Sequence, residues 1–290
     1  MAHSSAPRIS GRTSVSSGPA ERTEDLEDQW PIRLPLSAFT LDGFSDWATS
    51  SKRPWPSKLS FLGDLIFMER PGHWAIQIPL NARTLEGFCE WATSRHFPHR
   101  GRISFLGQEI VITMSPEELE THNKAKMEVC RVIGNLNHEE DLGSFYGDRT
   151  LLRNKDGDLS TEPDGSFASW KSLETGRVFL KPRKDKEGQF IEIQGTPDWV
   201  LEVVSDDTVG KDTRTLRQKY HRAGIPEYWL IDARRAKISF QILLRGRTGY
   251  RAAPAKGGWQ TSRVFGRRFR LERRRDRLGL WQYTLQVETP

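Results

Sequence analysis

The chain of 290 residues has only two cysteines, Cys89 and Cys130. So few cysteines exclude a disulfide framework and a zinc site built from cysteine thiolates. They are typical of a protein kept in a reducing compartment, and we expect a cytoplasmic location. Long apolar runs are also missing. No segment approaches the roughly 18 residues of a membrane-spanning helix, so we expect no membrane partner.

The first 29 residues lack the apolar segment of a secretory signal and are rich in serine and arginine. Their low hydrophobicity predicts a disordered N-terminal tail over 1–29. A transit peptide is the alternative suggested by the Ser/Arg composition.

Acidic residues are scarce in one segment, 245–277, which has twelve Lys and Arg against Glu272 and Asp276. Its net charge is +10, while the rest of the chain carries −4 of the total of +6. Such arginines either form a solvated or structural face, paired with acids elsewhere, or contact phosphate groups. We expect a basic C-terminal extension over 246–290 that ends in an edge strand. On the second interpretation, its candidate nucleic-acid-binding residues are Arg273, Arg274 and Arg275.

An internal repeat occurs at an offset of 44 residues, where 34–69 aligns without gaps to 78–113 with 17 of 36 positions identical. In each copy a threonine, Thr40 or Thr84, precedes a short apolar helix, and a hairpin around Leu-Gly follows. Two copies are too few for a solenoid. The sequence therefore predicts a duplicated helix-hairpin unit, with its first copy within 30–75.

The segment 76–245 begins with the second copy and then alternates helices and strands. The predicted elements are a helix from Ser115 to about residue 138, a strand over 199–204, a helix over 212–223, and strands over 227–232 and 237–244. Only a few residues connect the second helix to the next strand, which favours a right-handed crossover between two parallel strands. We expect an α/β domain with a mixed sheet flanked by helices.

Carboxylates in the apolar strand "WVLEVV" suggest a functional site. Asp198 and Glu202 lie on one face if the strand alternates, and buried acids need a cation or hydrogen bonds. Asp164, in "EPDGSF", would meet Glu202 at one sheet edge if its strand is a neighbour. Oxygen ligands without nearby Cys or His favour Mg²⁺ or Mn²⁺ over zinc. Alternatively, Asp164 is a turn residue and Glu202 forms a buried ion pair with Arg214 or Lys219.

Four segments in the order "MSPEELETH", "TEPDGSF", "PDWVLEVVSDDT" and "YHRAGIPEYWLID" resemble the Uma-type family of putative restriction endonucleases, within the PD-(D/E)XK nuclease superfamily. The resemblance covers about residues 78–245. It implies a restriction-endonuclease-like core and a Mg²⁺-dependent site, in which Asp164 and Glu202 are metal ligands and Asp198 supports the metal. His122 matches a histidine of the family and would line the site, although a solvated helix position is the alternative. The first repeat copy and the basic extension lie outside the family pattern.

The chain departs from this family at its lysine. The superfamily lysine would fall at Val204, and the helix lysine of Uma-type members would fall at Leu216. Lys219 is one turn on and is our candidate for the catalytic cation, because a step of three keeps a side chain near the same helical face. Lys211, just before the predicted helix, is the second candidate.

These observations predict a cytoplasmic, Mg²⁺- or Mn²⁺-dependent endonuclease that hydrolyses DNA, with Asp164, Glu202 and Lys219 at its catalytic centre and a homodimer as a further expectation. The alternative is a catalytically impaired module that keeps the nuclease fold and binds nucleic acid or a protein partner.

Overall fold

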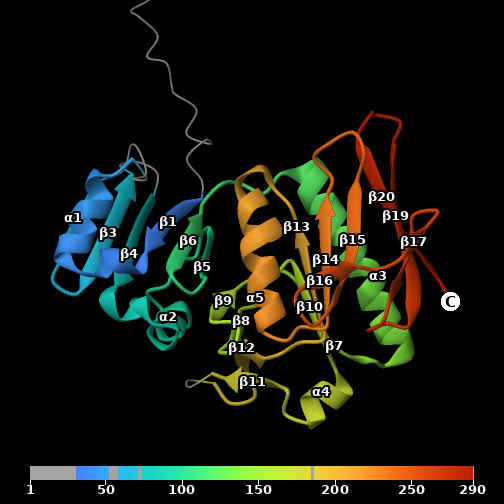
Figure 1. The fold of residues 1–290 in the computed structure, drawn as a ribbon, viewed down its shortest axis with the longest axis horizontal. Coiled ribbons are helices and arrows are strands. Elements are labelled where there is room, and N and C mark those ends of the chain that lie inside the picture. Colours follow the sequence, from blue (N-terminus) through green and yellow to red (C-terminus); the bar gives the residue numbers. More distant parts are fainter. Residues whose placement is uncertain (1–30, 52–57, 71–73, 184–185, 290) are drawn as a thin grey trace, which may run out of the picture.

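A six-stranded mixed sheet lies at the centre of the computed structural model, which describes residues 31–51, 58–70, 74–183 and 186–289 (Figure 1). The predicted N-terminal tail over 1–29 lies outside the described residues. The strand order is β16-β15-β14-β13-β10-β7. Their bounds are β7 Gly143–Tyr146, β10 Gly165–Ser169, β13 Trp199–Val203, β14 Glu227–Asp232, β15 Ser239–Arg245 and β16 Tyr250–Ala252.

The parallel pair in this sheet is β13 and β14, as the short crossover predicts. The other neighbouring strands are antiparallel. The crossover consists of a π-helical segment, Lys211–Leu216, that continues into α5, Arg217–Arg222. Residues 209 and 210 are already helical, so the helix begins three residues earlier than predicted and its first part has wider turns.

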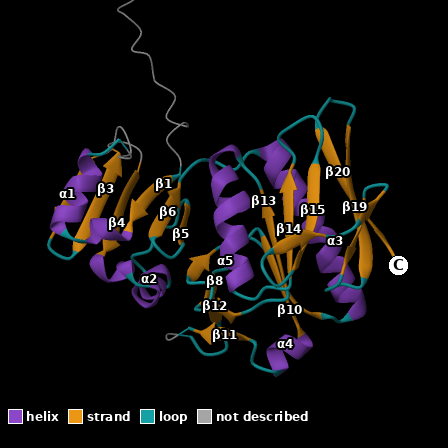
Figure 2. Ribbon diagram, in the orientation of Figure 1, coloured by secondary structure: helices purple, strands orange, loops and turns teal. Residues whose placement is uncertain are grey.

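Both faces of the central sheet are covered, which explains the uninterrupted apolar strand (Figure 2). One face packs against α3, Lys124–Glu140, and against a C-terminal antiparallel sheet. The other face packs against α5, where Val200 and Val204 meet Leu216 and Tyr220. The C-terminal sheet consists of β17 Ala255–Lys256, β18 Trp259–Ser262, β19 Arg267–Arg275 and β20 Trp281–Glu288.

The start of α3 differs from the prediction. A π-helical turn, Leu119–Asn123, leads into the helix, so helical structure begins four residues after Ser115. The carboxylate of Glu118 caps it by accepting backbone N–H groups from Glu120 and the two residues that follow. An acid at this position also favours the positive end of the helix dipole. No helix among the described residues is long and apolar enough to cross a membrane.

Two further sheets contain the strands of the repeat segments and four strands that lie between α3 and β13 in the chain. One has the order β1-β6-β5-β9-β8-β12-β11 and the other the order β2-β3-β4. The bounds are β1 Ile32–Pro35, α1 Leu41–Thr49, β2 Lys58–Leu62, β3 Leu65–Arg70, β4 Trp74–Pro79, α2 Leu85–Ala92, β5 Arg102–Phe105, β6 Glu109–Thr113, β8 Leu152–Asn154, β9 Leu159–Thr161, α4 Trp170–Glu174, β11 Val178–Pro182 and β12 Phe190–Gly195.

The first strand of each repeat segment pairs with the last strand of the other. β1 pairs with β6, and β4 pairs with β3, both antiparallel. Thr40 and Thr84 cap α1 and α2 by accepting N–H groups three residues on, as predicted. Side chains of both segments contribute to one core. The boundary predicted at residues 75/76 therefore runs through a shared hydrophobic core.

This strand exchange can be tested through Leu34 of β1, whose side chain is fully buried in the shared core. Leu34→Ala removes buried methyl groups next to β6, so we expect the free energy of unfolding to fall by about 2–5 kcal/mol. Urea denaturation measures the difference. The matched control is Leu62→Ala, because Leu62 is 59% exposed and should change stability by less than about 0.5 kcal/mol. Equal effects of the two changes would contradict the exchanged strand.

Candidate active site

Asp164 and Glu202 come together at the end of β13. The antiparallel register of β10 and β13 pairs Gly165 with Leu201, so one step further sets Asp164 opposite Glu202. Opposite residues of an antiparallel pair lie on the same side of a sheet. Both side chains are buried, Asp164 completely. The sequence prediction that these two acids meet at one sheet edge is consistent with this register.

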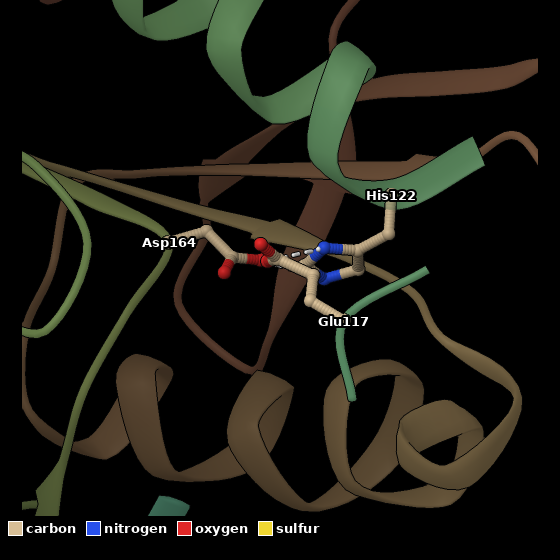
Figure 3. Close-up of side chains that lie close together, drawn as sticks. All are labelled: Glu117, His122 and Asp164. Atoms are coloured by element: carbon tan, nitrogen blue, oxygen red, sulfur yellow. Dashed lines mark ion pairs between the residues drawn. The ribbon is translucent and has the colours of Figure 1, made fainter. Parts of the chain in front are cut away.

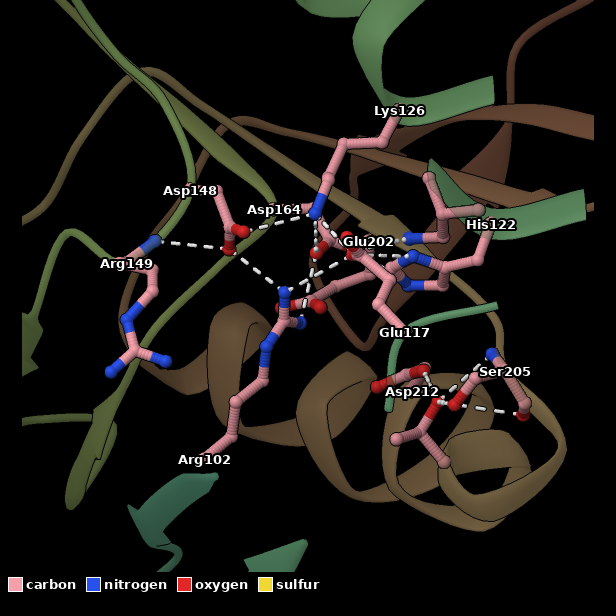
Figure 4. Close-up of polar contacts among 12 residues, drawn as sticks. Arg102, Glu117, His122, Lys126, Asp148, Arg149, Asp164, Glu202, Ser205 and Asp212 are labelled. Carbon is pink, nitrogen blue, oxygen red and sulfur yellow. Dashed lines mark hydrogen bonds and ion pairs between the residues drawn. The ribbon is translucent and has the colours of Figure 1, made fainter. Parts of the chain in front are cut away.

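The carboxylate of Asp164 is surrounded by donors (Figure 4). Its Oδ1 accepts a hydrogen bond from Arg102 at 2.9 Å, and its Oδ2 accepts one from the backbone N–H of Val203 at 2.8 Å. The ammonium of Lys126 lies 4.0 Å from Oδ1. Burial alone would raise the pKa of Asp164, but the contacts with His122 and Arg102 outweigh it and hold the pKa well below its usual range.

His122 lies between Asp164 and Glu117 (Figure 3). Its Nε2 is 3.5 Å from Oδ2 of Asp164 and its Nδ1 is 2.8 Å from Oε1 of Glu117, close enough for an ion pair although not aligned as a hydrogen bond. Burial lowers the pKa of His122, but the two carboxylates more than offset it and raise the pKa to about 9. The ring is therefore an imidazolium at neutral pH.

These three residues offer donor atoms within 4.8 Å of one another, near enough for one metal ion. His122 contacts the two acids with opposite ring nitrogens, so its imidazolium form is a charged bridge between two carboxylates. To bind a metal the ring would have to lose one proton, because an imidazolium has no lone pair to give.

Two further cations complete the charge balance around Asp164. Lys126 is buried and contacts Glu117 as well as Asp148, the latter at 2.9 Å. Arg102 also contacts Asp148, at 2.8 Å. The three acids of this cluster thus face three positive groups, Arg102, Lys126 and the imidazolium, so the half of the site around Asp164 is neutral.

The half of the site around Glu202 has two acids, Glu202 and Asp212, beside one cation, Lys211. Tyr220 donates a hydrogen bond of 2.5 Å to Oε1 of Glu202. Burial, together with the charges of Asp212 and Asp164, raises the pKa of Glu202 to about 8 although Lys211 acts in the opposite direction. Lys211 is buried, with its Nζ 3.5 Å from Oδ1 of Asp212. Burial lowers the pKa of this lysine, but Asp212 and Glu202 reverse the effect and raise it.

A divalent cation suits this half of the site. Burial raises the pKa of Asp212, and its Oδ1 is buried without a hydrogen bond, although Nζ of Lys211 lies 3.5 Å away. Buried carboxylates with raised pKa values are short of positive charge, and an all-oxygen set is what Mg²⁺ prefers. Glu202 and Asp212 are therefore of the chemical type that binds magnesium or manganese, while the three described residues whose donor atoms lie within 4.8 Å of one another are Glu117, His122 and Asp164.

Asp198 and Lys219 lie away from this site. Asp198 precedes β13, so strand alternation does not govern its direction. Its carboxylate accepts the N–H of Ser169 at 2.7 Å and pairs with Arg177. Nζ of Lys219 donates to the backbone carbonyl of Asp158 at 3.1 Å. Lys211 is instead the lysine whose charge acts on both Glu202 and Asp164.

The three candidate arginines of the basic extension have different environments. Arg273 donates to the backbone carbonyls of Ala233, Arg235 and Ala236, and its guanidinium lies 3.9 Å from the ring centre of Trp281. Arg275 covers the same ring at 3.5 Å and donates to the carbonyl of Gly279. Arg274 and Arg275 are exposed. Arg273 therefore ties the C-terminal sheet to the connection between β14 and β15, and Arg275 braces the turn between β19 and β20.

Sequence reasoning missed Arg102, Glu117, Lys126 and Asp148. One signal was available: Lys126 follows His122 by four residues, and residues four apart share a helical face. If His122 lines a site, Lys126 should line it too. Arg102 and Asp148 lie in a strand and a loop far from Asp164 in the chain, and no periodicity marks them.

The architecture is thus an α/β fold in which buried carboxylates gather at the end of a parallel strand pair. The model of the Uma2 family, described as "Putative restriction endonuclease", matches residues 85–272, and the chain belongs to this family. Among solved structures, the chain is similar to a putative nuclease belonging to DUF820 from Anabaena variabilis, with 17% identity, a TM-score of 0.46, and coverage of 63% of this chain and 90% of that one. None of the curated proteins matches it. The expected α/β class, with a mixed sheet flanked by helices, is confirmed by the described strands and helices.

The charge balance around Asp164 predicts a large cost for removing Lys126. Lys126→Met leaves Glu117 and Asp148 without their buried cation, and breaking a buried pair by removing one partner typically costs about 3–5 kcal/mol. Guanidinium denaturation at neutral pH measures the loss. The matched control is Lys124→Met, because Lys124 pairs with Glu120 on the surface and should cost about 0–1 kcal/mol. An unchanged stability of the Lys126 variant would show that the cluster is not electrostatically coupled.

Proposed function

We propose that this protein hydrolyses phosphodiester bonds of DNA with the help of Mg²⁺ or Mn²⁺, and that Asp164 and Glu202 hold the metal. The observation that carries the proposal is the opposed, buried pair of these carboxylates at the strand end, in a chain that belongs to a restriction endonuclease family. Oδ1 of Asp212, a carboxylate whose charge acts on Glu202, is buried without a hydrogen bond and supports a cation at this place.

Lys211 is the proposed catalytic cation, in preference to Lys219. Both were candidates because the helix position of the family lysine is Leu216, which is buried in the core. Lys211 opens the π-helical segment and is buried beside Asp212, with its charge acting on Glu202. Lys219 contacts Asp158 instead. Lys211, whose charge acts on Glu202, can offset negative charge that develops on a phosphate bound there. Lys219 cannot, because its ammonium group contacts Asp158.

The side chains around the pair have distinct tasks. Tyr220 fixes Glu202 by its short hydrogen bond, and the N–H of Val203 fixes Asp164. When bound, the metal polarises a phosphoryl oxygen and makes hydroxide available at neutral pH. Arg102 holds Oδ1 of Asp164, so its guanidinium must shift for that oxygen to bind a cation, and it is then available to a phosphate oxygen.

A second candidate function is a module that keeps the fold and binds nucleic acid without cutting it. The neutral half of the site favours this alternative, because Arg102, Lys126 and His122 already balance the acids around Asp164. Titration calorimetry with Mg²⁺ and Mn²⁺ separates the two. An enzyme needs metal binding that disappears with Glu202→Gln, whereas the module needs none.

The main test is cleavage of plasmid and linear duplex DNA in Mg²⁺ or Mn²⁺, with a chelator as the blank. We expect Glu202→Gln to abolish cleavage and to keep the fold by circular dichroism, because it removes a carboxylate that burial disfavours. Glu174→Gln, an exposed acid on α4, is the matched control. Cleavage by the Glu202 variant at the parental rate would refute the metal assignment.

The two lysines are compared in the same assay. Lys211→Met should slow cleavage by about 10²–10³-fold, because it removes a preorganised positive charge at the reacting phosphate. Lys219→Met should leave the rate within about twofold, since its Nζ contacts Asp158. The opposite ranking would assign the catalytic cation to Lys219.

A further inference from the structure

We infer that the loop between α2 and β5, residues 93–101, is a surface that grips the phosphate backbone of nucleic acid beside the active site. This inference rests on the proposed function for its substrate and locates where that substrate is held. The sequence analysis placed nucleic-acid contacts in the basic C-terminal extension instead.

The loop, "TSRHFPHRG", has no acidic residue. Four of its side chains are exposed and basic or imidazole-bearing, namely Arg95, His96, His99 and Arg100. Nε of Arg95 contacts the neighbouring His96 at 3.2 Å, and neither arginine pairs with an acid among the described residues. Arginines without an acidic partner remain available to phosphate, which they bind with two parallel hydrogen bonds.

A chain of contacts connects this loop to the catalytic carboxylates. Arg149 donates to the backbone carbonyls of Gly101 at 3.3 Å and His99 at 3.4 Å. The backbone N–H of Arg149 binds Asp148, which pairs with Arg102, which in turn donates to Asp164. Figure 4 shows Arg149, Asp148 and Arg102 in a row that ends at Asp164. A strand gripped by the loop would thus have its neighbouring phosphates at the site.

The loop is held firmly from its inner side. The ring of Phe97 packs edge-on against Trp91, with centroids 4.8 Å apart, and against Phe88. Gly101 has φ +78°, and a Cβ there would lie 2.2 Å from Sδ of Met114, so only glycine allows the close turn into β5. A surface fixed in this way loses little conformational entropy when it binds a ligand.

The basic extension is less suited to the same task. Arg273 and Arg275 donate to backbone carbonyls, and three more of its arginines are paired with acids. Arg267 pairs with Glu140, Arg268 with Glu288 and Arg270 with Glu272. Phosphate would have to compete with these acids. These five arginines are thus engaged within the protein, whereas Arg95 and Arg100 of the loop 93–101 face no acid among the described residues.

The experiment measures binding of a fluorescein-labelled 20-base-pair duplex by anisotropy, in a chelator so that cleavage cannot occur. The double change Arg95→Gln/Arg100→Gln should weaken binding roughly 10- to 100-fold at 0.1 M salt and reduce the log–log salt slope by about 1.8. Arg131→Gln/Lys171→Gln removes the same charge from α3 and α4 and should change affinity by less than about threefold. Thermal melting checks that each variant is folded.

Two outcomes would overturn the inference. One is unchanged affinity of the loop variant, and the other is a larger loss on changing Arg274 and Arg277 of the extension to Gln, which would move the contact to that segment. Failure of the proposed function gives another result. The parent protein would bind the duplex with a salt slope that falls in the loop variant, but Mg²⁺ or Mn²⁺ would produce no cleavage. If the loop variant cleaves DNA at the parental rate, the proposed function stands and the loop has no part in holding the substrate.

Discussion

The burial of one carboxylate, Asp164, constrains much of this structure. A charged oxygen without solvent is tolerated only when donors surround it, and here they come from three separate parts of the chain. Arg102 comes from β5, His122 and Lys126 from the start of α3, and the backbone N–H from β13. The positions of these elements are thereby coupled, because displacing any of them leaves the charge incompletely compensated.

The central strands and the pairing of Asp164 with Glu202 could be predicted because they depend on local pattern. An apolar strand, a short crossover and a glycine-proline helix end determine β13, α5 and β14 with little help from the rest of the chain. Lys211 was underrated for a physical reason. The segment that it opens is π-helical, so spacing rules for an α-helix do not describe which side chains face the strand.

Electrostatic partners were hidden from sequence reasoning because charged residues look alike whether buried or solvated. Lys126 sits in a polar stretch that resembles an exposed face, and its burial follows only from the acids that fold over it. Asp198 differs from expectation in another way. Strand alternation predicts that it shares a face with Glu202, but it precedes the strand and its carboxylate accepts the N–H of Ser169. Glu227 is similar, since four donors, including Ser262 and the N–H of Arg263, enclose a glutamate that reads as an ordinary strand start.

The exchange of β1 and β4 between the repeat segments has a consequence for the solubility of the chain. Without β1, the strand Glu109–Thr113 would end the seven-stranded sheet and expose a row of unpaired N–H and C=O groups, a template for strands of other molecules. β1 ends that sheet with a short strand that closes on Pro35, a poor template. The two segments cover each other as the subunits of a strand-swapped dimer would, but covalent linkage makes this protection independent of protein concentration.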